Sequence, residues 1–165
     1  MSADDNAPDT VDQGPDNPGV VAHPPVLYLA GLAAGFMIDL VWPLPFLSTT
    51  RQFALGGGFL GFGVLVIALG VVGFAKAGTN VPTNRPATAL VTTGVHRFSR
   101  NPIYIALTAI AFGVAFMVDS IWMVVSMLPV FVVMNVGVVA REERYLEAKF
   151  GDDYRAYKKR VRRWL

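Results

Sequence analysis

The amino-acid sequence predicts an all-α, polytopic membrane protein with about four transmembrane helices, a cytosolic loop and an amphipathic C-terminal helical tail. Three observations predict this fold class. Apolar residues make up 53% of the 165 residues and charged residues only 16%, whereas a soluble domain carries roughly a quarter charged residues. Four apolar runs can each cross a hydrocarbon core of about 30 Å, which takes roughly 20 helical residues. Basic residues gather in one connecting loop and in the tail.

An acidic segment precedes the predicted spans. Residues 1–25 contain five aspartates and no lysine or arginine, so they bury too little apolar surface to offset the entropy of ordering, and we expect disorder there. Residues 26–165 then form one membrane domain. Buried helices of a soluble protein are the alternative, but four such runs leave too little polar surface to cover them. The predicted spans are Val26–Trp42, Leu55–Ala75, Ile103–Val118 and Ser120–Ala140.

Glycines inside the first two spans favour close contact between helices. The second span contains "GGGFLGFG", but a dinucleotide-binding fingerprint needs a preceding strand and a following acidic residue, and neither is present. Small residues let transmembrane helices approach each other closely. The stretch "GLAAG", Gly31 to Gly35, has the same interpretation.

The composition excludes several kinds of site. The chain has no cysteine, so disulfides, thiolate metal sites and cysteine nucleophiles are excluded. Its two histidines, His23 and His96, are too few and too far apart to suggest a metal site. No metal is therefore expected.

The distribution of positive charge predicts the orientation. Residues 76–101 carry four basic residues and the tail from Arg141 carries nine, whereas the first connection has only Arg51 and the third has none. Two spans separate the basic loop from the basic tail, so both face the same side, and basic flanks mark the cytoplasm. We therefore expect a multi-pass membrane protein whose polar clusters face the cytosol.

The stretch "GVHRFSRNPIYIA", residues 94–106, brings dense polarity to the start of the third span. Pro102 suits the first turn of a helix, where its missing N–H costs nothing, and Asn101 before it is a good cap. Arg97 and Arg100 precede a helix that begins with donor N–H groups, which predicts a site for anions or carboxylates. The alternative is that these arginines anchor the chain to lipid phosphates.

The tail begins with two carboxylates directly after the fourth span. Helical periodicity places Val138, Glu142 and Leu146 on one face. A carboxylate at the membrane surface can bind a cationic or hydroxyl-bearing ligand. It can also be a solvated helix end that pairs with Arg141 or Lys149.

The rest of the tail predicts a second, amphipathic helix. Gly151 breaks the first helix, and Asp152 or Asp153 can cap the next one. Aromatic and apolar residues then recur at helical spacing against a basic face, which is typical of a helix in the headgroup region. This helix either anchors the chain or closes over the loop as a lid. The stripe consists of Tyr154, Tyr157, Val161 and Trp164.

Three residues inside the spans stand out. Asp39 is a functional-site candidate because it is a carboxylate in a span, although it lies near enough to the interface to reach water. Asn135 lies in the fourth span and can line a cavity. Pro129 is expected to kink that helix.

Two motifs together resemble a known family. "LVTTGVHRFSRNPIYIA" and, one helical hairpin later, "EERYLEAKFGDDYRAYKKRV" resemble the isoprenylcysteine carboxyl methyltransferase family, which is grouped with membrane phospholipid methyltransferases. The resemblance covers residues 76–164. The short, four-span architecture fits the compact, prokaryotic-looking members of that family, which implies a prokaryotic inner membrane. It implies an integral membrane enzyme that uses S-adenosylmethionine to methylate a hydrophobic or lipid-like acceptor at the cytosolic face.

The resemblance also implies roles for individual residues. His96 stands where the family usually has tyrosine. Val138 stands where the carboxyl methyltransferases have an arginine for the substrate carboxylate. This disfavours a prenylcysteine carboxylate as the acceptor and leaves a lipid amine, a thiol or another small hydrophobic nucleophile open. The implied cofactor contacts are Leu90, Val91, Gly94, His96, Asn101, Pro102, Tyr104, Glu142 and Glu143, the catalytic residues are Arg100 and Tyr104, and the substrate contacts are Asn135, Val138 and Tyr157.

Partners follow from this interpretation. We expect a lipid-like or small hydrophobic acceptor and membrane lipids, and no nucleic acid; the sequence leaves the oligomeric state open. One alternative is a non-catalytic membrane protein that docks anionic lipids or a partner through its basic tail. Another is a membrane reductase of similar hydropathy, although no nicotinamide-binding signature is present.

Overall fold

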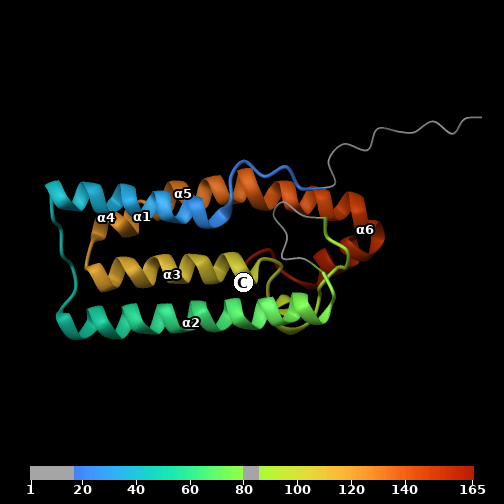
Figure 1. The fold of residues 1–165 in the computed structure, drawn as a ribbon, viewed down its shortest axis with the longest axis horizontal. Coiled ribbons are helices and arrows are strands. Elements are labelled where there is room, and N and C mark those ends of the chain that lie inside the picture. Colours follow the sequence, from blue (N-terminus) through green and yellow to red (C-terminus); the bar gives the residue numbers. More distant parts are fainter. Residues whose placement is uncertain (1–16, 80–85) are drawn as a thin grey trace, which may run out of the picture.

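The computed structural model describes residues 17–79 and 86–165. Every regular element in this part of the chain is helical, which confirms the all-α prediction (Figure 1). Residues 1–16 of the predicted disordered segment lie outside the described residues. The elements are α1 Pro24–Val41, α2 Thr49–Lys76, a 3₁₀ turn Gly94–Arg97, α3 Pro102–Val118, α4 Ile121–Val125, α5 Met127–Val133, a π-helical segment Met134–Val139 and α6 Ala140–Arg160.

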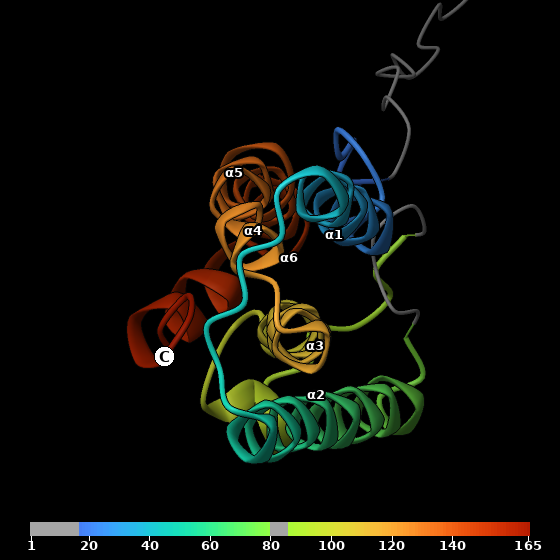
Figure 2. The same ribbon diagram turned by 90° about the vertical axis from the view of Figure 1, so that its left-hand side faces the viewer.

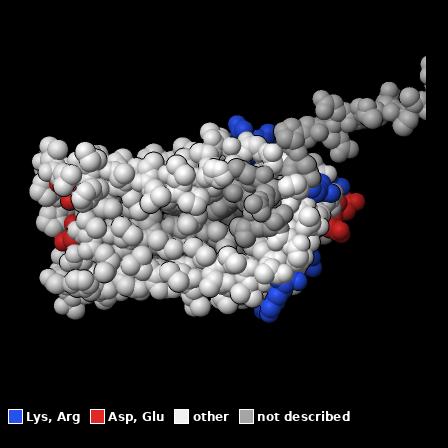
Figure 3. All heavy atoms as spheres, in the orientation of Figure 1, with Lys and Arg blue, Asp and Glu red and all other residues white. Residues whose placement is uncertain are grey.

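All four predicted apolar runs are helical, but several of their ends differ from the prediction. Helices α1 and α2 and the rod Ile121–Arg160, which α4 to α6 form together, are long and apolar enough to cross a membrane, and α3 is a shorter apolar helix. α2 begins six residues before the predicted Leu55, because the polar residues around Arg51 continue the helix. Figure 3 shows charged side chains at the two ends of the molecule and almost none along the side between them, as expected of a bundle that spans a bilayer.

α3 is the central helix of the bundle. Figure 2 shows α2 on one side of it and α1 with the rod on the other. Gly56, Gly63 and Gly70 of α2 face α3, and a Cβ added at Gly63 would lie 2.7 Å from the carbonyl oxygen of Ala106. Gly35 of α1 lies equally close to the backbone of α4. The predicted close approach of helices at small residues is therefore confirmed.

Polar groups close the far end of the bundle, where α1 and α3 end. Asp119 has a left-handed conformation (φ 59°), and its Oδ1 accepts hydrogen bonds from the N–H groups of Phe46 and Leu47 at 3.0 and 2.9 Å. The hydroxyl of Ser120 donates to Oδ1 of Asp39 at 2.8 Å. Asp39 thus ties α1 to the turn between α3 and α4.

The rod contains two irregularities. α4 ends at Val125, four residues before Pro129, because the proline ring removes one helical hydrogen bond and crowds the carbonyl of the residue four positions earlier. This agrees with the predicted kink. The π-helical segment contributes three fully buried side chains to the core, those of Met134, Val138 and Val139. In the same core cluster lie Tyr28 of α1 and Tyr104 of α3.

The tail differs from its prediction after residue 160. Gly151 bends α6 (φ 51°, ψ −122°), as expected of a helix breaker. The helix then ends at Arg160 and Val161 is extended (φ −123°, ψ 132°), so the prediction of a helical stripe that reaches Trp164 is wrong. Asp152, a predicted cap, instead accepts hydrogen bonds from the side chain of an arginine three residues on.

Residues 17–23, at the end of the segment before α1, follow the rod. The N–H of Val21 donates to the carbonyl of Gly137 at 3.2 Å. The Arg141 guanidinium donates to the carbonyl of Gly19 at 2.7 Å. These contacts hold the approach to α1 beside the cavity described next.

Candidate functional site

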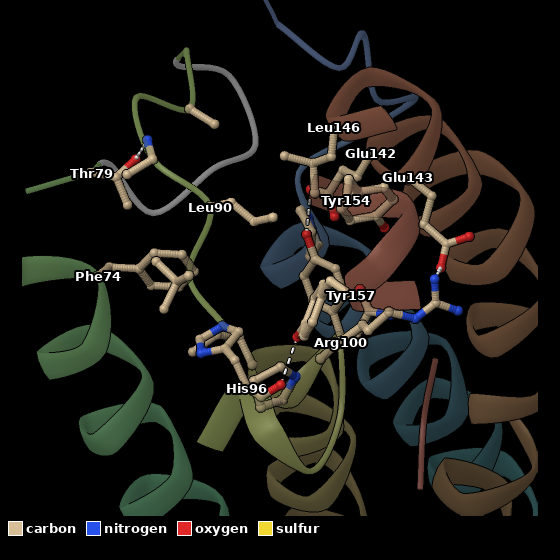
Figure 4. Close-up of a pocket in the computed structure, with 18 of the residues that line it drawn as sticks. Phe74, Thr79, Leu90, His96, Arg100, Glu142, Glu143, Leu146, Tyr154 and Tyr157 are labelled. Carbon is tan, nitrogen blue, oxygen red and sulfur yellow. Dashed lines mark hydrogen bonds and ion pairs between the residues drawn. The ribbon is translucent and has the colours of Figure 1, made fainter. Parts of the chain in front are cut away.

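A cavity of about 190 Å³ opens at the end of the bundle where α2 ends and α3 begins. Its walls come from the starts of α1 and α3, the end of α2, the loop between α2 and α3, and α6 (Figure 4). Most of the lining is apolar. The polar lining residues are Thr79, His96, Arg100, Asn101, Tyr104, Glu142, Glu143, Tyr154 and Tyr157.

One wall joins the two sequence motifs directly. The hydroxyl of Tyr104, in the first turn of α3, donates to Oε1 of Glu142, near the start of α6, at 2.6 Å. Both side chains are 7% exposed. Tyr28 of α1 supports this wall, because its hydroxyl lies 2.7 Å from the Thr108 hydroxyl, which itself donates to the Tyr104 carbonyl. The pair therefore rests on a packed scaffold of three helices.

Glu143 has different partners from its neighbour. Successive helical residues point about 100° apart, so Glu143 turns toward two guanidinium groups. Arg100 Nη1 lies 3.1 Å from its Oε1. Arg163 forms a two-pronged contact, with Nε at 3.0 Å from Oε1 and Nη2 bound to Oε2. Among the described contacts, neither glutamate pairs with Arg141 or Lys149, which was the alternative considered from the sequence.

The predicted anion site at the start of α3 needs correction. Arg100 lines the cavity but is paired with Glu143, and Arg97 is exposed, with its guanidinium 4.9 Å from the ring centre of Phe98. The Asn101 side chain does not cap α3, because its Nδ2 donates to the Arg163 carbonyl at 2.9 Å. Every described lysine or arginine of the lining is thus in an ion pair, although Arg100 Nε has no hydrogen-bond partner among the described residues.

His96 forms the wall opposite Glu142 (Figure 4). Its ring is 5% exposed and stands edge-on to Phe74, with 4.9 Å between ring centres. Burial lowers the pKa of His96 to about 4, so the ring is neutral at pH 7. Its Nδ1 has no hydrogen-bond partner among the described residues, while its carbonyl accepts a hydrogen bond from the Tyr157 hydroxyl at 2.6 Å.

The segment Val161–Leu165, here called the strap, crosses the back of the site. The carbonyl of Arg162 accepts from the N–H of Arg100 at 2.9 Å. The carbonyl of Arg163 accepts from Asn101 Nδ2 and from the Ser99 hydroxyl, the latter at 3.1 Å. Sequence reasoning missed this element, because backbone carbonyl acceptors leave no signature in side-chain patterns.

Three predicted site residues do not line the cavity. Gly94 has φ +61° and begins the 3₁₀ turn that carries His96. Val138 is fully buried in the core. Asn135 binds the indole N–H of Trp164 at 3.1 Å. The sequence analysis in turn missed apolar lining residues that carry no motif, namely Pro24, Pro25, Phe74, Ile103 and Leu107.

Comparison with known proteins identifies the family. The family model described as phospholipid methyltransferase matches residues 51–153. The chain belongs to the phospholipid methyltransferase family. Membership together with the apolar helices indicates a membrane methyltransferase. The matched range includes Tyr104, Glu142 and Arg100, and it ends before Tyr154, Tyr157 and the strap.

Other comparisons add little about this methyltransferase family member. The chain is 67% identical to an uncharacterized protein of Haemophilus influenzae over 33 residues, which cover 20% of the chain and 52% of that protein. The chain thus spans about half the length of this curated relative. No solved structure matches. Among the described residues, no group of three or more metal-ligating side chains could hold a metal ion.

Proposed function

We propose that the chain transfers a methyl group from S-adenosylmethionine to a hydrophobic or lipid-like acceptor at the membrane surface. One observation carries the proposal: the buried Tyr104–Glu142 hydrogen bond lies on the cavity wall and joins both sequence motifs. The basic loop and tail support the cytosolic side as the location of this site.

The charges of the described lining fit a cationic cofactor. Its charged residues are Arg100, Glu142 and Glu143. Two arginines neutralise Glu143, whereas Glu142 has the neutral Tyr104 hydroxyl as its partner. Glu142 is therefore suited to a sulfonium or ammonium group, and a buried carboxylate without a cation favours such a ligand strongly.

The other predicted cofactor contacts, except Gly94, lie around the same cavity. Leu90 and Val91 offer an apolar surface for the adenosine part. The unpartnered Nδ1 of His96 supports a polar ligand nearby, because a buried polar atom without a hydrogen bond is costly. Asn101 and Pro102 complete the wall where α3 begins. The residues present therefore fit the cofactor.

When bound, S-adenosylmethionine supplies an electrophilic methyl group on its sulfonium. The protein needs no covalent intermediate for this displacement, and its contribution is to align two reactants and exclude water. Holding two reactants in line can contribute about 7–11 kcal/mol to lowering the barrier. Tyr104 fixes Glu142 in place, and Arg100 fixes the adjacent Glu143, so both predicted catalytic residues act on the carboxylates of the site.

The same charges bear on the acceptor. A carboxylate acceptor needs a cation, but Arg100 and Arg163 are both engaged by Glu143, and Val138 is fully buried in the core. This disfavours a prenylcysteine carboxylate and leaves a lipid amine, a thiol or another small hydrophobic nucleophile. The apolar lining residues Ile103 and Leu107 of α3 offer such an acceptor a surface on the side of the spans.

Methyl transfer into lipids tests the proposal. Purified protein in bilayer vesicles is incubated with methyl-labelled S-adenosylmethionine and a membrane lipid extract, and extracted label is counted. Glu142→Gln should abolish transfer and binding of the cofactor while membrane insertion persists. Glu147→Gln is the matched control, because Glu147 lies on the same helix but is part-exposed and pairs with Lys158. Wild-type protein that is folded and binds no S-adenosylmethionine would refute the proposal.

Lipid docking through the basic tail is the weaker alternative. At least three of the tail's cations are already paired with carboxylates, Lys158 with Glu147, Arg163 with Glu143 and Arg155 with Asp152. Docking on anionic lipids should weaken steeply with ionic strength, whereas binding to a buried cavity should not. Measuring both the affinity for S-adenosylmethionine and the affinity for anionic vesicles at low and high salt therefore separates the two functions.

A further inference from the structure

The strap lies outside the residues that the family model matches, yet it touches both walls of the cavity. On one side its carbonyls hold the loop before α3, through the N–H of Arg100 and the amide of Asn101. On the other side the Arg163 guanidinium grips Glu143 of α6. One short segment thus connects the loop before α3, which carries Arg100 and Asn101, to Glu143 of α6.

The contact between Arg163 and α6 is a bidentate ion pair, which is a strong interaction. A guanidinium that binds both oxygens of a carboxylate fixes angle as well as distance. Glu143 is 7% exposed, so its carboxylate is shielded from water, whereas the Arg163 side chain is 41% exposed. Arg163 approaches it from the strap and Arg100 from the loop, which places one carboxylate between the two elements.

A second anchor holds the strap from the other direction. The Trp164 indole N–H donates to Asn135 Oδ1 at 3.1 Å, and its ring lies against Phe131, with 5.3 Å between ring centres. This explains Asn135, which the sequence singled out as a polar residue within a span. Asn135 serves the strap and not the cavity.

We propose that Arg163 is a positioning residue for the cofactor site, and that the strap is a brace that fixes the loop wall against the α6 wall. Arg163 acts through Glu143 and touches no ligand. The proposal rests on the proposed function only in the choice of ligand. Without the brace, Tyr104 and Glu142 keep their own hydrogen bond, but Asn101 and Arg100 lose the support that holds them at the cavity.

The test measures the dissociation constants of S-adenosylmethionine and of S-adenosylhomocysteine for the full chain in bilayer vesicles, together with the thermal midpoint. Arg163→Gln should raise the dissociation constants of both ligands by about tenfold, within the range expected of coupled contacts. Arg163→Lys keeps the positive charge but cannot bind both oxygens of Glu143 as the guanidinium does, so it should restore part of the lost affinity. Arg160→Gln removes the same charge from an exposed position at the end of α6 and should bind as wild type.

A double-mutant cycle separates positioning from general stability. If Arg163 acts through Glu143, then Arg163→Gln should have no further effect on affinity once Glu143→Gln is present. Fully additive losses, or wild-type affinity in Arg163→Gln, overturn the proposal. If Arg163→Gln does not fold, Trp164→Phe replaces it, because that variant keeps a ring and loses only the bond to Asn135. Weaker binding in Trp164→Phe supports the brace, and unchanged binding overturns it.

The two proposals fail in different ways. Wild-type protein that binds neither ligand refutes the proposed function. Wild-type protein that binds both, with Arg163→Gln binding equally well, refutes only the brace.

Discussion

The two ends of the bundle each hold a pair of carboxylates, and the pairs differ in burial and in partners. At the far end, Asp39 and Asp119 are half-buried and accept hydrogen bonds from backbone N–H groups of a connection and from the Ser120 hydroxyl. At the cavity end, Glu142 and Glu143 are each 7% exposed and bind side chains, namely a phenol and two guanidiniums.

Under the proposed function, this difference separates carboxylates that close a turn from carboxylates that serve a ligand. A half-buried aspartate that caps N–H groups keeps part of its hydration, so it stabilises a connection at low cost. Two adjacent, nearly fully buried glutamates carry a large desolvation penalty. Closing a turn does not require that penalty, and a cavity wall that must attract a cation does. Burial of the carboxylates themselves, and not the mere presence of an acidic residue in a span, therefore marks the candidate functional end.

The largest expected effect that sharpens this comparison comes from Tyr104→Phe. The substitution leaves the buried Glu142 carboxylate without its hydroxyl donor, which costs about 1–3 kcal/mol. We expect affinity for S-adenosylmethionine to change about 100-fold at most, equivalent to ~2.7 kcal/mol, in the direction of weaker binding because Glu142 is no longer held in place. Isothermal titration of the variant and of Trp122→Phe, which removes a hydrogen-bond donor outside the cavity lining, measures it. Equal affinities in the two variants would break the assignment of Glu142.

Acid should destabilise the cavity end through His96. Burial lowers its pKa to about 4, below the usual value of about 6.5, so the unfolded chain binds the proton more readily between these values. Stability therefore falls as pH drops from about 6.5 to 4, by about 2 kcal/mol after allowance for solvent screening. His96→Phe keeps a ring beside Phe74 and should flatten this part of the curve of thermal midpoint against pH. Parallel curves for wild type and variant would contradict a buried neutral histidine.

The sequence predicted the cavity end better than the strap, for a physical reason. Tyr104 and Glu142 belong to the two side-chain motifs that resemble a known family, and that resemblance predicted that they meet in one site. The role of Arg163 was not, because it depends on how the chain turns after Gly151 and Val161, and on carbonyl acceptors that any residue supplies. Helical periodicity beyond Arg160 predicted the wrong structure there.

The spans show the same division. Gly56 and Gly63 were predictable as contact points, because only small residues permit close helix approach. The ends were less so: α2 runs through Arg51 because a helix near an interface tolerates charge. Asp39 could not be assigned from sequence, since its partner Ser120 lies 81 residues away.

At the far end, Asp119→Ala should affect stability and not binding. The variant loses two hydrogen bonds to the N–H groups of Phe46 and Leu47 and a turn residue that tolerates φ 59°, which together cost about 1–2 kcal/mol. We expect a lower thermal midpoint and an unchanged dissociation constant for S-adenosylmethionine. Weakened binding at a matched fraction folded would show that the two ends are coupled and would break the comparison.

The smallest effect should come from Trp122→Phe. The Trp122 indole N–H donates to the Trp42 carbonyl at 2.8 Å, and the two rings lie 6.0 Å apart. Both residues are partly exposed, so the lost hydrogen bond costs only about 0.5–1 kcal/mol. Trp164→Phe is the matched substitution at the cavity end, where the same loss releases the strap. If the far-end variant lowers only the thermal midpoint while the cavity-end variant also weakens ligand binding, the same chemical change has different consequences because only one indole is connected to the site.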